Sequence, residues 1–167
     1  MQDIMRYKTQ LNYSEALVQQ AVIRFWLRSV GAGFFAAFVL LVSLFVFMLY
    51  TSQSGWLVGA LGAFLFLAVL FVVLVYVVHY KRSINKFKAM NPKSASLEVS
   101  ESEFSLSSSL GTVSLTWQAI SDVWVYENMW LIFFSKYQFS TIPLSGISEE
   151  EQVYFLAQIK LAGGKID

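Results

Sequence analysis

The most apolar part of the chain is an uninterrupted run in its first half. From Ser29 to Tyr80 there is no Asp, Glu, Lys or Arg. A membrane-spanning helix needs about 20 apolar residues for a hydrocarbon core roughly 30 Å thick. These 52 residues therefore predict two spans, at about 30–50 and 57–79, and the short stretch TSQSGW between them predicts an antiparallel hairpin. Two core helices of a soluble protein are the alternative, which the absence of a polar stripe disfavours.

The pattern ahead of this run changes once. Residues 4–13 alternate, with Tyr7, Thr9 and Leu11 on one face and polar residues on the other, which is typical of a half-buried strand. Residues 14–28 switch to helical spacing, with Ser14 placed as N-cap. Residues 1–28 are therefore predicted to form a strand followed by an amphipathic helix.

The chain beyond the apolar run predicts a compact β domain at 94–167. Short segments with strand patterns recur at 96–100, 103–107, 112–117, 122–127, 130–134 and 137–142. Ser148 and Glu151 have the spacing of a capping box, which predicts a helix over about 148–162. Its residues Val153, Phe155 and Ile159 are expected on one apolar face that covers the sheet. The strand at 4–13 is expected to add a seventh strand to this domain.

Charge divides the chain into a basic and an acidic part. Residues 1–93 carry a net charge of +7 and residues 94–167 a net charge of −6. The basic residues flank the two predicted spans, whereas the connection between the spans has no Lys or Arg, so the positive-inside rule predicts that both termini are cytoplasmic. The predicted membrane-interface anchors are Arg24, Trp26, Arg28, Lys81, Arg82, Lys86 and Lys88, the last four in a basic juxtamembrane linker at 81–93. The acidic domain disfavours nucleic acid as a partner.

Residue chemistry narrows the function classes further. The chain has no cysteine and one histidine, His79, and neither a metal-ligand spacing nor a glycine-rich phosphate loop occurs. The predicted spans contain no ionisable group of the kind that marks transporters and pumps, apart from His79 at the end of the second span. We therefore expect no catalytic residues, no metal and no cofactor, and we expect that the protein is not an enzyme.

Two features indicate association with other molecules. Trp124, Tyr126 and Trp130 lie within seven residues, and exposed aromatic residues are enriched at protein interfaces. We expect them to form a partner surface, while burial in the domain core is the alternative. The small residues Gly33 and Gly59, each followed four residues later by Ala, permit close helix packing within the hairpin or in a homo-oligomer.

The layout of the whole chain resembles the YcxB-like family of bacterial membrane proteins. The resemblance is carried by an N-terminal strand and helix, a two-helix hairpin, and a strand-rich domain with a Trp117-Gln118-Ala119-Ile120 turn followed by SDVWVYENMWLIFFSKYQFSTIP. It implies an α+β membrane protein whose small pleckstrin-homology-like (PH-like) barrel or curved sheet is closed by the C-terminal helix. It implies no catalytic residues.

The leading hypothesis is a non-enzymatic protein of the bacterial inner membrane. Its two spans place a PH-like interaction domain at the cytoplasmic face, where it binds or regulates another protein. One alternative is a membrane-resident immunity protein whose acidic domain neutralises a basic toxin. Another is a small oligomeric pore, which the lack of a polar stripe on either span disfavours.

Overall fold

The structure is a computed structural model that describes residues 7–52, 55–135 and 138–167. The chain divides into two compact units. One unit is helical and comprises residues 22–83. The other unit is assembled from both ends of the chain, residues 1–21 and 84–167.

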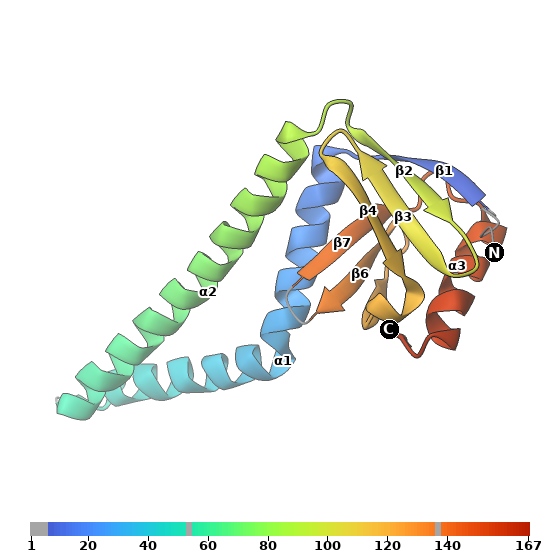
Figure 1. Cartoon of the computed structure of the whole chain (residues 1–167). Helices are drawn as coiled ribbons and strands as arrows, with labels where there is room; N and C mark the ends of the chain where they lie inside the picture. The colour runs from blue at the N-terminus through green and yellow to red at the C-terminus, as the bar shows by residue number, and fades with distance from the viewer. Residues whose placement is uncertain (1–6, 53–54, 136–137) are drawn as a thin grey trace. The chain divides into compact units, whose positions relative to one another are not determined.

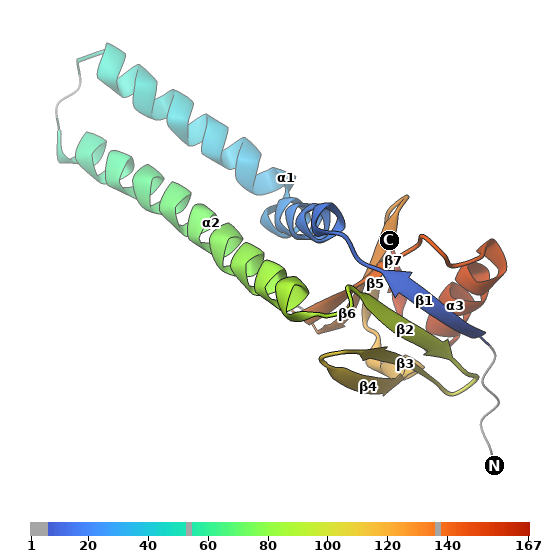
Figure 2. The ribbon, with the colours of Figure 1, turned by 90° about the horizontal axis from the view of Figure 1, so that it is seen from above.

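Two long helices, α1 (Glu15–Tyr50) and α2 (Trp56–Ala89), supply the helical unit. Each is long and apolar enough to cross a membrane, and of their most apolar stretches 0% and 6% of the residues are buried. These apolar stretches are therefore largely exposed within the chain, whereas a core helix of a soluble protein would be mostly buried. Beyond Gly31, α1 runs antiparallel to α2 (Figure 2). Both predicted spans are thus confirmed as helices of one hairpin.

Helix α1 is broken at Gly31. The backbone there has φ 77° and ψ 150°, a region that is essentially restricted to glycine. The predicted amphipathic helix and the predicted first span are therefore two helical segments joined at a glycine. Helix α2 is longer than the predicted second span, because it continues to Ala89. The predicted basic juxtamembrane linker at 81–93 is helical over its first nine residues.

Small residues in the hairpin do not all mediate packing. A Cβ atom added at Gly62 would lie 3.2 Å from the Phe45 ring, which marks a close approach of the two helices. A Cβ atom added at Gly33 or Gly59 would meet nothing within 4 Å. Close packing within the hairpin therefore uses Gly62 and not the two glycines expected from the sequence.

The second unit contains two four-stranded sheets and one helix (Figure 1). The first sheet has the order β1-β2-β3-β4 and the second β7-β6-β5-β8, with all neighbours antiparallel except β5 and β8. The strands are β1 (Tyr7–Asn12), β2 (Ser94–Val99), β3 (Glu103–Ser108), β4 (Gly111–Thr116), β5 (Asp122–Val125), β6 (Met129–Ser135), β7 (Gln138–Pro143) and β8 (Lys165–Ile166). A 3₁₀ turn, η1 (Trp117–Ala119), links the sheets, and α3 (Glu149–Leu161) precedes β8.

The strand predictions are confirmed within a few residues, with β8 as an unpredicted addition. The N-terminal strand pairs with β2 over its whole described length, from Tyr7 opposite Val99 to Asn12 opposite Ser94. Residues 4–6 of the predicted strand lie outside the described residues. The domain is therefore completed by a strand that precedes both long helices in the chain.

The expected closed barrel is not found among the described strands, since no ladder joins the two sheets. The core instead consists of side chains from both sheets, η1 and α3. Phe155 of α3 lies 4.9 Å from Trp117 and 5.6 Å from both Phe104 and Trp130, measured between ring centroids. An aromatic cluster thus fixes α3 to both sheets.

Helix α3 begins with the predicted capping box. The Ser148 hydroxyl accepts a hydrogen bond from the Glu151 N–H at 3.3 Å, and the Ser148 N–H donates to the Glu151 carboxylate at 2.8 Å. Phe155 and Ile159 are buried as predicted. Val153 is 70% exposed, so its assignment to the buried face was wrong. At 100° per residue, Val153 lies about 160° away from Phe155 around the helix.

Candidate functional site

Aromatic side chains gather at both ends of the apolar helices. At one end, the Trp26 indole N–H donates to the Val72 carbonyl at 3.2 Å, and its ring lies 5.7 Å from the Tyr76 ring, which stacks on Tyr80. At the other end, Tyr50 and Trp56 are more than three-quarters exposed. Tyr and Trp with such a distribution are typical of the two membrane–water interfaces.

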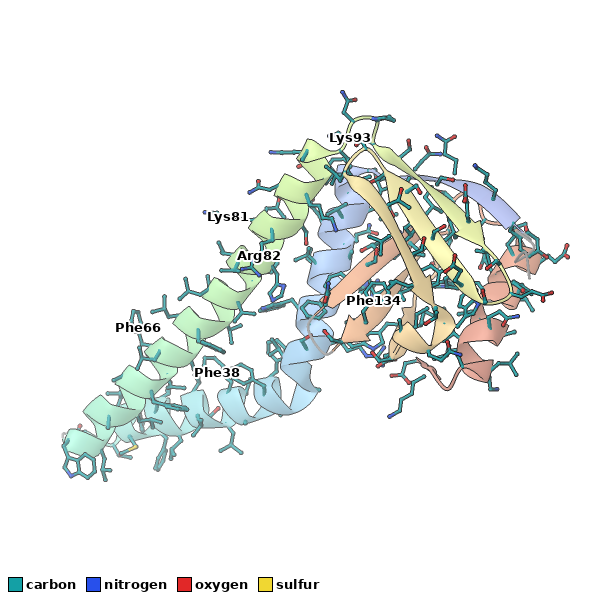
Figure 3. The ribbon with its side chains drawn as sticks, in the orientation of Figure 1. Phe38, Phe66, Lys81, Arg82, Lys93 and Phe134 are labelled. Carbon is teal, nitrogen blue, oxygen red and sulfur yellow. The ribbon has the colours of Figure 1, made fainter. Side chains whose placement is uncertain are left out.

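The basic residues predicted as interface anchors lie on the surface. Arg24, Arg28, Lys81, Arg82, Lys86 and Lys88 are all exposed, and Trp26 is partly buried. Lys81 and Arg82 project from α2 just beyond its apolar stretch, whereas Phe66 projects from within that stretch (Figure 3). The helix therefore changes from an apolar to a basic surface within about one turn of Tyr80.

Trp130 does not belong to an exposed partner surface. Its side chain is 1% exposed and packs against Phe155 in the core. All residues from Met129 to Phe133 are buried, so both faces of the central strand β6 are covered. Alternation along β6 could not reveal this, because the alternation argument assumes that one face meets solvent. The inclusion of Trp130 in the predicted surface was wrong.

Trp124 and Tyr126 remain partly exposed on and beside β5. The Trp124 ring lies 4.4 Å from the Phe133 ring, and its indole N–H donates to the Asp122 carboxylate at 3.3 Å. Val125 is 40% exposed. Beside it, the Val125 N–H donates to the Asp167 carbonyl at 2.8 Å, next to the exposed Ile166 of β8. Exposed and partly exposed apolar side chains therefore lie at β5 and β8, with Trp124 and Val125 on opposite faces of the sheet because successive strand residues alternate.

The first sheet carries a shallow groove of about 470 Å³ on its outer face. Its lining residues come from β1, β2, β3 and the segments beside them and are mostly polar: Lys8, Thr9, Gln10, Ser94, Ser96, Ser107, Ser108 and Ser109. The Lys8 ammonium forms an ion pair with Glu98 at 2.7 Å, so the one cation in the lining is neutralised. The sequence did not predict this groove, because outward-facing hydroxyls give no periodic signal beyond polarity.

The first turn of α3 is tied to β1. The Tyr7 hydroxyl donates to Glu150 at 3.1 Å, and the Thr9 hydroxyl donates to Glu151. Burial raises the pKa of the Glu151 carboxyl, but its hydrogen bonds from Thr9 and from the N–H and hydroxyl of Ser148 outweigh that effect, and the pKa lies below its ordinary value. The N-terminal strand is thereby linked to the C-terminal helix as well as to β2.

A second tie connects the end of β1 to β7. The Tyr13 hydroxyl donates to the Thr141 carbonyl at 2.9 Å. Burial raises the pKa of Tyr13 to about 12, because the ionised phenolate would lose hydration. These contacts serve the assembly of the domain.

No group of three or more metal-ligating side chains occurs in the parts of the chain that the structure describes. His79 lies with its ring 5.1 Å from the Phe25 ring in the helical unit. The arrangement therefore offers surfaces for binding, namely the apolar patch around β5 and the hydroxyl-lined groove.

Residues 99–159 match the YcxB-like protein family. The match covers β3 to β7 and most of α3, which is the segment containing the turn at Trp117. The family resemblance seen in the sequence is thereby confirmed over this part of the chain. No curated protein and no solved structure matches the chain.

Proposed function

Taking the YcxB-like segment at residues 99–159 as the premise, we propose that this chain is a non-enzymatic protein of the bacterial inner membrane. A two-helix hairpin anchors a small interaction domain at the cytoplasmic face, where the domain binds and regulates another protein. The two sheets and the closing helix support a PH-like architecture for that domain.

The pairing of β1 with β2 is the observation that carries the proposed topology. Strand β1 precedes α1, and β2 follows α2, yet the two strands share a continuous antiparallel register of six residue pairs. Strands can pair only on the same side of a membrane. If the two helices cross a bilayer, they must therefore do so as a hairpin that returns the chain to its starting side.

The positions of the aromatic residues support spans of the right length. Trp56 and Tyr76 lie 20 residues apart on α2, which corresponds to about 30 Å along a helix. Gly31 and Tyr50 on α1 enclose a segment of similar length. The hydrocarbon core of a bilayer is roughly 30 Å thick. The segments bounded by these residues on α1 and on α2 are therefore each long enough to cross it.

The distribution of basic residues supports a cytoplasmic location for the domain. Six exposed basic residues flank the apolar segments on the domain side, and residues 50–56 at the opposite end contain no Lys or Arg. This asymmetry is the one described by the positive-inside rule. The exposed cations are also placed to attract anionic headgroups.

The orientation is tested with single cysteines, because the chain has none of its own. Ser52→Cys lies between the helices, and Ser109→Cys lies at the exposed tip of the β3–β4 hairpin. A membrane-impermeant maleimide applied to intact spheroplasts should label Ser52→Cys at once and Ser109→Cys only after permeabilisation. The reverse pattern would overturn the orientation, and equal labelling of both would overturn the hairpin.

The binding function is tested by affinity capture from native membranes. The variant is Trp124→Ala, and the matched control is Trp56→Ala, whose indole is exposed far from the domain in the sequence. A protein that is enriched by wild type and by the control, and lost with Trp124→Ala at unchanged circular dichroism, supports recognition through the β5 surface. Its identity separates a regulator from a toxin-neutralising protein. Equal recovery with all three proteins would exclude that surface.

A further inference from the structure

Strand β4 is an unprotected edge of the first sheet. It is the last strand in the order β1-β2-β3-β4, so one side of its backbone has no partner strand among the described residues. All of its residues except Leu115 are exposed, and Val113 is 54% exposed. An unpaired edge presents a row of main-chain donors and acceptors that another strand can use.

The other long edges of the two sheets are protected. The outer side of β1 meets the α3 region through the hydrogen bond from Thr9 to Glu151, and the Gln10 carbonyl lies 3.3 Å from where a Cβ of Gly146 would be. Strand β7 ends in Pro143, and β8 has only two residues. These are the usual devices against strand addition. Strand β4, with the sequence GTVSLT, has no charge, no proline and no bulge in its register.

We propose that β4 is a self-association site, at which β4 of a second copy of this chain adds antiparallel across a two-fold axis. An antiparallel ladder reads the same from both strands, so an edge can pair with its own copy without a change of hydrogen-bond pattern. The absence of charge on β4 means that two identical edges meet without direct repulsion. The proposal concerns the β-rich unit and does not depend on membrane insertion.

The register of the hairpin identifies the groups that pair. Strands β3 and β4 are connected by two residues, with Ser108 opposite Gly111. The closing pair of such a hairpin is hydrogen-bonded, and the pattern alternates from there. The main-chain groups of Thr112, Ser114 and Thr116 therefore point away from β3, towards the open edge.

A two-fold axis beside Val113 suits both the polar and the apolar groups. Thr112 and Ser114 of each copy then exchange main-chain hydrogen bonds, and Val113 faces Val113 of the other copy. Leu106 lies opposite Val113 within each sheet. The pairing thereby creates an apolar row of four side chains across the junction and covers the exposed Val113.

The test uses the full chain in detergent micelles and in native membranes. Val113→Cys places a thiol at the axis, where facing Cα atoms are about 4.5 Å apart, a distance compatible with a disulfide. Val153→Cys is the matched control, since Val153 is equally aliphatic, is even more exposed and lies on α3. We expect mild oxidation to convert Val113→Cys to a covalent dimer at least tenfold faster than Val153→Cys.

A second variant tests the edge without a crosslink. Val113→Lys adds a charge at an exposed position, so the monomer should fold normally, but two lysines would face each other at the axis. We expect light scattering to report a dimer for wild type and a monomer for Val113→Lys at the same concentration. Equal crosslinking of the two cysteine variants, a dimer that persists in Val113→Lys, or attachment of Val113→Cys to a different protein would overturn the proposal.

Discussion

Replacing Leu11 by alanine tests whether the N-terminal strand is an integral part of the domain core. Leu11 is fully buried in β1 and lies opposite Ala95 of β2. The substitution removes three carbon atoms, worth about 2.4 kcal/mol of transfer free energy at roughly 0.8 kcal/mol each. The cavity left in a well-packed core adds to this cost, giving about 3–4 kcal/mol in total. Small domains are stable by about 5–15 kcal/mol, so the loss is a large share of the whole.

The measurement is denaturant-induced unfolding of the full chain in micelles, followed by tryptophan fluorescence. Trp117 and Trp130 are buried in the core, so they report on the loss of packing in this unit. The matched control is Leu110→Ala, because Leu110 is 46% exposed at the hairpin tip and should cost no more than about 0.5 kcal/mol. If Leu11→Ala costs less than about 1 kcal/mol, or no more than the control, β1 is not part of the folded core.

Three further predictions concern individual interactions. Thr9→Val removes one of the hydrogen bonds that lower the pKa of Glu151. That stabilisation is present above the unfolded pKa of about 4.5 and is lost as pH falls through the lower folded pKa. Because solvent screens this largely exposed carboxylate, the variant should lose no more than about 1 kcal/mol at pH 7 and converge with wild type in acid. An offset that is the same from pH 3 to 7 would contradict this. Because burial raises the pKa of Tyr13 from 10.0 to about 12, wild-type stability is lost as pH rises across this interval, and Tyr13→Phe should show a shallower decline in alkaline unfolding curves. Gly31→Ala should destabilise the protein by about 1–3 kcal/mol, because alanine disfavours the positive φ at this position. Gly33→Ala should be neutral or stabilising. Equal effects of the two substitutions on thermal unfolding would refute a special backbone requirement at Gly31.

Sequence periodicity predicted the elements of this protein well where one face of each element meets solvent. Strand β1 shows this, because its buried Leu11 alternates with the exposed Gln10 and Asn12. The capping box at Ser148 was likewise readable, since it depends on local spacing alone. That β1 joins the C-terminal domain followed from its apolar face and from the prediction that both ends of the chain lie on one side, whereas its partner strand was not predicted.

The failures occurred where tertiary contacts decide burial. Trp130 lies in a strand covered on both faces, so its alternation with neighbours carried no information about exposure. Val153 was misplaced by assigning too wide an apolar face to α3. The sequence could not show that the helix breaks at Gly31, because glycine is common in membrane helices. Only the backbone angles distinguish Gly31 from the other glycines of the apolar run. Barrel closure depends on contacts between sheet edges, which no local pattern encodes.

The pairing of β1 with β2 also orders events during synthesis. Some 80 residues separate the end of β1 from β2, and bacterial and other ribosomes add roughly 5–20 residues per second. Strand β1 therefore waits about 4–16 seconds for its partner, and in that interval both long helices emerge. Completion of the domain is accordingly a late, non-local step of folding. In a membrane-anchored chain, only molecules whose two helices have inserted as a hairpin can complete this step. Folding of the domain would then depend on correct insertion of the helices.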